Sequence, residues 1–397
     1  MNTSPVKWFH PLRKKTIVAL LVLIVAACST APTVQFSRGR LKMPEESESG
    51  LEPVVFLRGP MPTGVAISRS GRVFVNFPRW GDSVKFTVAE LREKDVRAYP
   101  SQPLNEGRDA NDGKLISAQS VVVDDKDRLW IVDTGSINFG PVAPGMAKLV
   151  GVNLETNQVF RTIPFPEDVV PSTSYLNDVR FDLNRGADGM AYLTDSGDKG
   201  LNGIIVVDLA SGKSWRRLGG DRSTVAERNF VPNVEGRPLL NRPASGAPSP
   251  LRMGSDGIAI DRSGGRLYYC PLIGHHLYSV SLEALSNPLL NDEGVRRTVV
   301  DHGDRGFASD GILEGPNGKL YLTDYENNAI RVRERNGAYS ILAQSPHLLW
   351  PDSLALSSDG YLYFTVNQLH RQARFQGGRD ERQQPYVIYR LPIRSET

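Results

Sequence analysis

The segment Asp256-Gly-Ile-Ala-Ile260 decides the fold of this chain because its pattern recurs along the sequence. Each copy is one polar residue followed by a short apolar run, then by a polar turn and a second apolar run. The six copies begin at Thr63, Gln119, Asn177, Asp256, Asp310 and Asp352. Such a unit cannot bury its apolar faces alone, and stacked neighbours share one core. The repeat therefore predicts an all-β fold, a six-bladed β-propeller.

The two ends of the chain are expected to close the ring. Pro53–Leu57 and Tyr386–Leu391 both read as strands. If the N-terminal strand joins the last blade beside the C-terminal strands, no sheet edge stays exposed. Helical periodicity is nearly absent, and a short helix or turn is expected only at 88–96 and 282–285.

The largest gap between copies separates Asn177 from Asp256. Within it, residues 226–252 hold five prolines, namely Pro232, Pro238, Pro243, Pro248 and Pro250. Loops of this length are uncommon in compact domains and are often functional. Two interpretations stay open: a lid over one face of the propeller, or simple padding.

The N-terminus reads as a processing signal. A basic stretch ends at Lys15, 12 apolar residues follow, and Val25-Ala-Ala-Cys28 resembles a bacterial lipobox. We predict a lipoprotein signal peptide at 1–28 with lipidation of Cys28, a flexible tether at 29–51 and the propeller at 52–397. Ser29, rather than Asp, after the cysteine favours the outer membrane of the cell envelope. Ordinary secretion and an uncleaved anchor are the rival interpretations.

The charge of the chain argues against nucleic-acid binding. The net charge of +3 depends on four basic residues before Cys28, without which 43 basic residues face 44 acidic ones, a net of −1. Cys270 is then the one remaining cysteine, and a buried thiol is the expected role. No pattern indicates an organic cofactor, and a monomer is expected.

The polar residue that opens each copy should lie at one mouth of the central channel. All six side chains carry oxygen, and three are carboxylates. Like charges held close together raise each other's pKa unless a cation compensates them. Ca²⁺ or another divalent cation, which takes six to eight oxygen ligands, would fit Asn177, Asp256 and Asp310. The alternative is that these residues only cap strands and form tight turns.

Other residues suggest linings rather than a catalytic constellation. Gln119, Asp352, Asn367, Trp350 and His347 are candidate ligand-binding residues, His347 as a base and Trp350 as an aromatic wall. A second polar series after the second strand, which includes Asp133 and Asp195, reads as structural. His275 and His276 are adjacent and should point apart. No nucleophile motif or phosphate-binding loop is present.

Several motifs in order resemble the yellow/major royal jelly protein family. They are Phe77-Pro-Arg-Trp80, Leu129-Trp-Ile-Val-Asp-Thr-Gly135, Tyr175-Leu-Asn-Asp-Val-Arg-Phe-Asp182, Ser255-Asp-Gly-Ile-Ala259, Leu267-Tyr-Tyr-Cys-Pro-Leu272, Leu349-Trp-Pro-Asp352 and Phe364-Thr-Val-Asn-Gln-Leu369. The resemblance covers about residues 52–393. It implies a secreted six-bladed propeller, with relatives that convert dopachrome or hold biogenic amines in the channel.

The gluconolactonase/senescence-marker-protein group is a wider resemblance. Its divalent metal is held by a Glu, two Asn and an Asp, and these positions fall on Thr63, Asn177, Asp256 and Asp310. Thr63 in place of Glu weighs against lactonase activity. We therefore expect a lipid-anchored protein that binds a small amine or aromatic ligand. The alternative is a metal-dependent lactone hydrolase or dopachrome-type isomerase that uses Asp256 and Asp310 as catalytic residues, and an interaction scaffold is a third interpretation.

Overall fold

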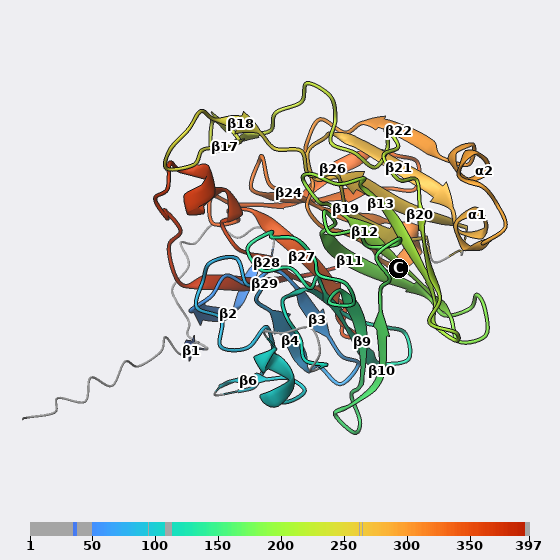
Figure 1. Ribbon diagram of the computed structural model, residues 1–397. Helices are drawn as coiled ribbons and strands as arrows, with labels where there is room; N and C mark the ends of the chain where they lie inside the picture. The colour runs from blue at the N-terminus through green and yellow to red at the C-terminus, as the bar shows by residue number, and fades with distance from the viewer. Residues whose placement is uncertain are drawn as a thin grey trace, which may run out of the picture. The chain divides into compact units, whose positions relative to one another are not determined.

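The computed structural model describes residues 35–37, 50–93, 95–107, 113–261, 263 and 265–393. These residues form a six-bladed β-propeller, as the repeat predicts (Figure 1). The predicted signal peptide and Cys28 lie outside the described residues. Gln35–Ser37 fall inside the segment expected to be a tether, and they pair as strand β1 with β2.

Every blade is an antiparallel sheet whose first strand lies nearest the axis. Blade 1 holds β3 (Val65–Ile67), β4 (Val73–Asn76), β5 (Val88–Leu91) and β6 (Val96–Ala98). Blade 2 holds β7 (Ala118–Val123), β8 (Arg128–Asp133), β9 (Lys148–Asn153) and β10 (Gln158–Pro164). Blade 3 holds β11 (Leu176–Asp182), β12 (Met190–Asp195), β13 (Gly203–Asp208) and β14 (Ser214–Arg217).

The second half of the ring repeats this plan. Blade 4 holds β19 (Ser255–Ile260), β20 (Arg266–Pro271), β21 (His276–Ser281) and β22 (Val300–Asp304). Blade 5 holds β23 (Ile312–Glu314), β24 (Leu320–Asp324), β25 (Ala329–Arg333) and β26 (Tyr339–Gln344). Blade 6 holds β27 (Pro351–Leu356), β28 (Tyr361–Val366), β29 (Tyr386–Pro392), β2 (Glu52–Arg58) and β1 (Gln35–Ser37).

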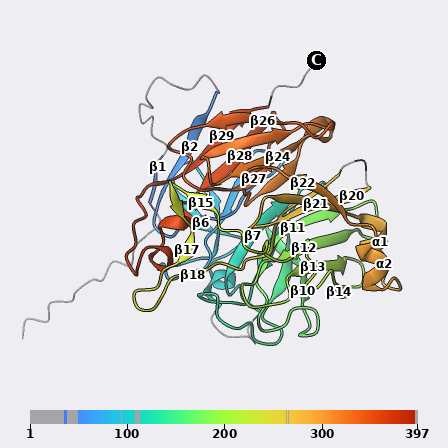
Figure 2. The ribbon, with the colours of Figure 1, turned by 90° about the horizontal axis from the view of Figure 1, so that it is seen from above.

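The two ends of the domain close the ring in blade 6, which confirms the predicted closure. The strand β2 pairs with β29, and β29 pairs with β28, so the sheet order is β1-β2-β29-β28-β27. Figure 2 shows these strands gathered in one sheet. The inner strands contact each other in sequence, and β27 contacts β3. The ring is therefore continuous.

The inner strands approach so closely that the glycine after two of the aspartates has no room for a side chain. A Cβ on Gly257 would lie 2.4 Å from the carbonyl oxygen of Asp310, and one on Gly311 would lie 2.2 Å from that of Asp352. Neither glycine has a positive φ. The Asp-Gly pairs therefore serve close packing between blades and not tight turns.

The short helices are partly where the sequence predicts them. Leu282–Ser286 form α1, and the side chain of Ser281 caps it by accepting a hydrogen bond from the N–H of Ala284. Asp292–Arg296 form α2, and 3-10 turns occupy Pro103–Glu106, Pro316–Gly318, Leu369–Arg371 and Ala373–Phe375. The segment 88–96, expected to be a short helix or turn, shows no helix among its described residues but does contain a turn, in which the N–H of Arg92 donates to the carbonyl oxygen of Asp95 at 2.9 Å. Its first residues form β5, whose fully buried positions suit a middle strand packed on both faces.

The proline-rich insertion lies over the face where the inner strands begin, called here the upper face. It contains the short hairpins β15–β16 (Asn233–Val234, Arg237–Pro238) and β17–β18 (Leu240–Asn241, Ser249–Pro250). Its apolar residues, including Val234 and Leu251, belong to the same buried cluster as Trp350. Figures 1 and 2 show β17–β18 beside the red loop between β28 and β29. This packing favours a cover over padding.

Candidate functional site

Three carboxyl groups meet on the propeller axis at the upper ends of the inner strands. Asp256, Asp310 and Asp352 begin or precede β19, β23 and β27, and their exposed fractions are 3%, 6% and 7%. Asp310 shares hydrogen bonds with the other two carboxyl groups. Together these three side chains form what we call the carboxyl ring.

Neutral donors hold the carboxyl ring in place. The Nδ2 of Asn177 donates to Asp256 Oδ2 at 2.6 Å, and the Nδ2 of Asn367 donates to Asp352 Oδ2 at 2.6 Å. The indole Nε1 of Trp350 donates to Asp310 Oδ2 at 2.7 Å. Because none of these donors is charged, they orient the carboxyl groups without neutralising them.

Burial sets the protonation of the carboxyl ring. Burial raises the pKa of Asp256 and of Asp352 well above the usual range, and repulsion from the carboxyl group of Asp310 adds to both shifts. Burial also raises the pKa of Asp310, to about 6, while the hydrogen bond from Trp350 and those from the other two carboxyl groups act in the opposite direction. The three carboxyl groups therefore retain protons to higher pH than isolated aspartates do.

An aromatic layer separates the carboxyl ring from the upper face. Tyr325 stacks on Trp350 with ring centroids 4.1 Å apart, and His370 stacks on the other side at 5.8 Å. Tyr175 donates to Gln119 Oε1 at 3.0 Å and accepts from Trp80 Nε1 at 2.7 Å. This layer excludes solvent from the ring, which explains why burial dominates its pKa shifts.

The cavity at the carboxyl ring is small. It measures about 10 Å³, and its lining comprises Gln119, Ser120, Asn177, Asp178, Asp256, Asp310, Gly311, Asp352 and Ser353. That volume is about enough for one water molecule or one ion. In the described part of the chain, no group of three or more His, Cys, Asp or Glu side chains has the arrangement expected of a metal site.

A much larger cavity occupies the lower half of the channel. It measures about 450 Å³ and is lined by residues of all six inner strands and by the turns that follow β7, β11 and β19. We call it the lower cavity. Asp178 and Ser353 line both this cavity and the one at the carboxyl ring. At that boundary, Arg180 Nη1 pairs with Asp178 Oδ2 at 2.7 Å.

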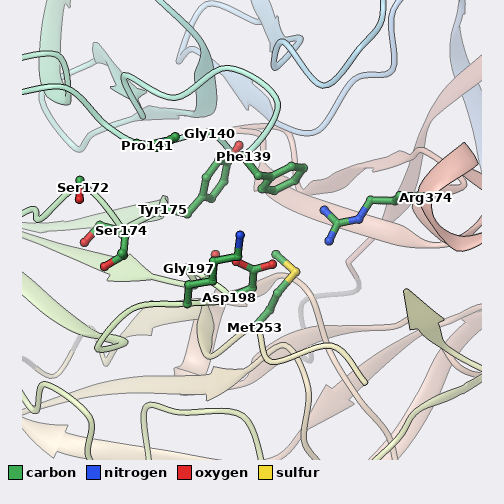
Figure 3. A pocket seen from close by; sticks show the side chains of 13 residues that line it. Phe139, Gly140, Pro141, Ser172, Ser174, Tyr175, Gly197, Asp198, Met253 and Arg374 are labelled. Carbon is green, nitrogen blue, oxygen red and sulfur yellow. The ribbon is translucent and has the colours of Figure 1, made fainter. Parts of the chain in front are cut away.

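A third cavity lies among the loops of the upper face and measures about 90 Å³. We call it the upper pocket. Its lining comprises Phe139, Gly140, Pro141, Ser172, Thr173, Ser174, Tyr175, Ser196, Gly197, Asp198, Lys199, Met253 and Arg374. Figure 3 shows Arg374 on one side of this pocket, with Phe139 beside Tyr175 and with Asp198 beside Met253. Met253, which lines this pocket, directly follows the proline-rich segment 226–252.

The structure brings most of the predicted site residues together, with two exceptions. Gln119, Asn177 and the three aspartates line the small cavity, while Trp350 and Asn367 hold two of the aspartates from outside it. Thr63 instead donates to the carbonyl oxygen of Gln119 and does not line that cavity. His347 is exposed and lines none of the three cavities described above.

The second polar series is structural, as the sequence indicates. Asp133 accepts hydrogen bonds from the backbone N–H groups of Ile116 and Ser117 and pairs with Lys148 at 2.8 Å. Asp195 accepts from the N–H of Tyr175 and pairs with Arg216 at 2.7 Å. These carboxylates fix the loops that enter the inner strands.

The remaining candidate residues are held separately. His275 Nε2 contacts Glu326 at 2.6 Å, and His276 Nδ1 contacts Asp301 at 2.9 Å, so the adjacent histidines do point apart. Cys270 is buried and free, and burial raises the pKa of its thiol.

Sequence reasoning missed the upper pocket and the lower cavity. Arg374 lies in a loop outside the repeat, and only its place in the fold brings it to Phe139. The residues that line the lower cavity include parts of the sequence motifs quoted above, for example Arg180 and Phe181, but the cavity itself was not predicted. Charged residues toward the lower ends of the inner strands, such as Arg180 and Glu314, were the available signal there.

The fold and the carboxyl ring define a six-bladed β-propeller with a polar, closed upper channel. The model of the major royal jelly protein family matches residues 116–393, and the chain belongs to that family.

Curated relatives are about a quarter identical to this chain over the residues that align. Protein yellow of Drosophila pseudoobscura pseudoobscura is 25% identical over 305 residues, which is 68% of this chain and 50% of that protein. Dopaminechrome tautomerase of Drosophila melanogaster is 23% identical over 303 residues, 70% of this chain and 61% of that protein. Major royal jelly protein 3 of Apis mellifera is 26% identical over 206 residues, 51% and 35% respectively. The chain thus spans less than two thirds of each relative.

Solved structures share the architecture at low identity. Regucalcin of Agrobacterium tumefaciens has a TM-score of 0.51 at 14% identity, covering 84% of this chain and 90% of that one. A luciferin-regenerating enzyme has a TM-score of 0.52 at 10% identity, covering 84% and 92%. These likenesses establish the fold.

The carboxyl ring predicts a pH dependence of stability. A carboxyl whose pKa is higher in the folded than in the unfolded protein contributes stability below its unfolded pKa and loses that contribution as pH rises through its folded pKa. For Asp310 that interval runs from 3.8 to about 6. We expect the free energy of unfolding of the wild type, minus that of Asp310→Asn, to fall by about 1–3 kcal/mol between pH 4 and pH 7.

Urea denaturation across this pH range measures the difference. Asp380→Asn is the matched control, because a hydrogen bond from Arg382 lowers the pKa of Asp380. Its difference from the wild type should not fall over the same range. A flat difference for Asp310→Asn would show that the pKa of Asp310 is not raised by folding.

Proposed function

We propose that the chain is a binding protein that takes a small organic cation with an apolar body into its lower cavity. The observation that carries this proposal is the 450 Å³ cavity on the propeller axis. That volume lies within the range of about 300–1,000 Å³ of small-molecule sites. The proposal keeps the amine or aromatic ligand that the sequence predicts and moves it to the opposite half of the channel.

The walls of the lower cavity suit an apolar or aromatic body. Its apolar lining consists of Val65, Ala66, Ile67, Val121, Val122, Val123, Phe181, Leu183, Ile260, Leu313, Leu354, Ala355 and Leu356. Phe181 is partly exposed and stacks on Trp130 with centroids 5.1 Å apart, so its ring is held in place. An ordered aromatic wall favours a flat ligand and can face a cation.

The charges of the lower cavity select a cation. Acidic residues outnumber basic ones in its lining, where Arg180 faces Asp124, Asp125, Asp178, Asp182, Asp261 and Glu314. Arg180 is already neutralised by Asp178 at 2.7 Å. Asp124 and Asp182 are also paired, with Arg128 at 2.6 Å and with Arg185 at 3.2 Å. The excess of acidic over basic residues in a concave lining still favours a cation over an anion, because a concave surface focuses the field of its charges.

One relative gives a chemical parallel. Dopaminechrome tautomerase, by its name, acts on a small ring compound derived from an amine. A ligand of that size and ring character is compatible with the lower cavity. The alternative of a lactone hydrolase or dopachrome-type isomerase that uses Asp256 and Asp310 has less support. Among the cavities described above, these carboxyl groups line only the one of about 10 Å³, which is too small for such a substrate.

Calorimetric titration of the full chain tests the ligand class. We expect 2-phenylethylamine to bind and 3-phenylpropanoate, of similar shape and opposite charge, to bind at least tenfold more weakly. The double change Glu314→Gln with Asp261→Asn should weaken amine binding about tenfold, because it removes two carboxylates of the cavity. The matched control is Glu155→Gln, an exposed residue outside the cavity. Equal binding of the two probes, or no effect of the double change, would contradict the proposal.

We propose a divalent cation at the carboxyl ring as a second feature. The observation that favours it is the set of carboxyl and amide oxygens around a cavity of the size of one ion. Asn177, Asp256 and Asp310 would hold the ion, with Gln119 and Asp352 beside them. Hard oxygen donors suit Ca²⁺. Its positive charge would lower the pKa of the carboxyl groups and so favour loss of their protons.

Calcium addition at neutral pH tests this feature. We expect Ca²⁺ to raise the melting temperature of the full chain and to release protons into a weakly buffered solution. Asp256→Asn should abolish both effects, while Asp380→Asn should preserve them. If Ca²⁺ neither stabilises the wild type nor releases protons, the carboxyl ring does not bind this cation and the proposal fails.

We further propose that Cys28 carries a lipid that attaches the protein to the cell envelope, with the outer membrane as its destination. No helix in the described part of the chain has the length and apolar character needed to cross a membrane. Buried methylenes contribute about 0.8 kcal/mol each, so several acyl chains would anchor the domain firmly.

Fractionation of Gram-negative cells tests the anchor. Cys28→Ala should release the domain from membranes, whereas Ser29→Asp should keep it attached and move it to the inner membrane. Cys270→Ala is the control and should leave fractionation unchanged, because that thiol is buried in the propeller. Continued membrane association of Cys28→Ala would refute lipidation at this position.

A further inference from the structure

The upper pocket contains a guanidinium that forms no ion pair with any of the described carboxylates. Arg374 lies in the 3-10 turn Ala373–Phe375, in the loop between β28 and β29. Figure 3 shows its side chain reaching into the pocket. Within the described residues, its one hydrogen bond is donated by Nη2 to Asn241 Oδ1 at 2.9 Å, and it has no ion-pair partner.

Arg374 packs against two aromatic rings. Its guanidinium lies over the ring of Phe139 at 4.7 Å and over that of Phe375 at 5.0 Å. Burial lowers its pKa, and the attraction of Asp198 and Tyr175 only partly offsets this effect. Withdrawing a charge from water without a partner is destabilising, and an anion placed beside it removes much of that penalty.

The other walls of the upper pocket define the rest of the ligand. Phe139 and Tyr175 form an aromatic pair with centroids 4.8 Å apart. Asp198 also lines the pocket, and no hydrogen bond or ion pair engages its side chain within the described residues. The pocket thus offers a cation, an aromatic wall and a hydrogen-bond acceptor around a volume of about 90 Å³.

We propose that the upper pocket binds a small aromatic carboxylate that also carries a hydroxyl group. Its carboxylate pairs with Arg374, because a planar guanidinium matches a carboxylate through two parallel hydrogen bonds. Its ring lies against Phe139, and its hydroxyl donates to Asp198. The small volume favours a single ring over a larger anion. This site takes the opposite charge from the lower cavity, so the two proposals stand independently.

Calorimetric titration of the full chain with 4-hydroxybenzoate tests the charge of the ligand. We expect its neutral isostere 4-hydroxybenzamide to bind at least tenfold more weakly. Arg374→Gln should weaken the binding of 4-hydroxybenzoate at least tenfold, because the unpaired guanidinium is lost. Arg379→Gln, an exposed arginine of the same loop, is the matched control and should leave the affinity unchanged. Equal affinity for the acid and the amide would overturn the proposal, as would unchanged affinity in Arg374→Gln.

A second variant keeps the test decisive if Arg374→Gln does not fold. Asp198→Asn should reduce the preference for 4-hydroxybenzoate over benzoate to about one, because the acceptor for the hydroxyl is weakened. A preference that survives this change would overturn the assignment of Asp198. Saturating 2-phenylethylamine should not displace 4-hydroxybenzoate, and competition between the two probes would mean that they share one site. If 2-phenylethylamine does not bind but 4-hydroxybenzoate does, the proposal for the lower cavity fails and the proposal for the upper pocket holds.

Discussion

Closure of the ring is the constraint on which the rest of the structure depends. Six inner strands can meet on one axis only if each one packs at backbone distance from the next. Gly257 and Gly311 make this possible, because any side chain at either position would overlap a carbonyl oxygen of the following blade. The pairing of β2 with β29 then holds the first and last segments of the domain together.

Close packing of the inner strands has an electrostatic consequence. The polar residues that open the strands are forced together, and three of them are carboxyl groups. Burial under the layer that contains Trp350 and Tyr175 keeps water away, which raises the pKa of all three carboxyl groups. The carboxyl ring closes the upper half of the channel. The lower half stays open, and the cavity of about 450 Å³ lies there, at the opposite end of the channel from these acidic residues.

The sequence predicted the repeated elements well because each blade is built from local signals. Alternating apolar strands and turn residues specify a blade without reference to distant segments. The exception is 88–96, where a short helix or turn was expected and no helix forms among the described residues. There Val88–Leu91 instead fill the middle of a sheet, and packing on both faces decided the outcome. Among the predicted site residues, Gln119 and Asp352 could be placed because they occupy equivalent positions of the repeat. His347 could not, because it belongs to a loop whose path the repeat does not define.

By itself, the sequence determined the six-bladed fold, its closure and the convergence of Asp256, Asp310 and Asp352, since all three follow from the phase of one repeated pattern. Only the tertiary structure decided which oxygens share protons, where the channel is open and where Arg374 lies. These properties depend on loops that differ from blade to blade and pack over one another. Their contacts arise from burial between segments far apart in the chain, such as Phe139 against Arg374, and no local pattern encodes them.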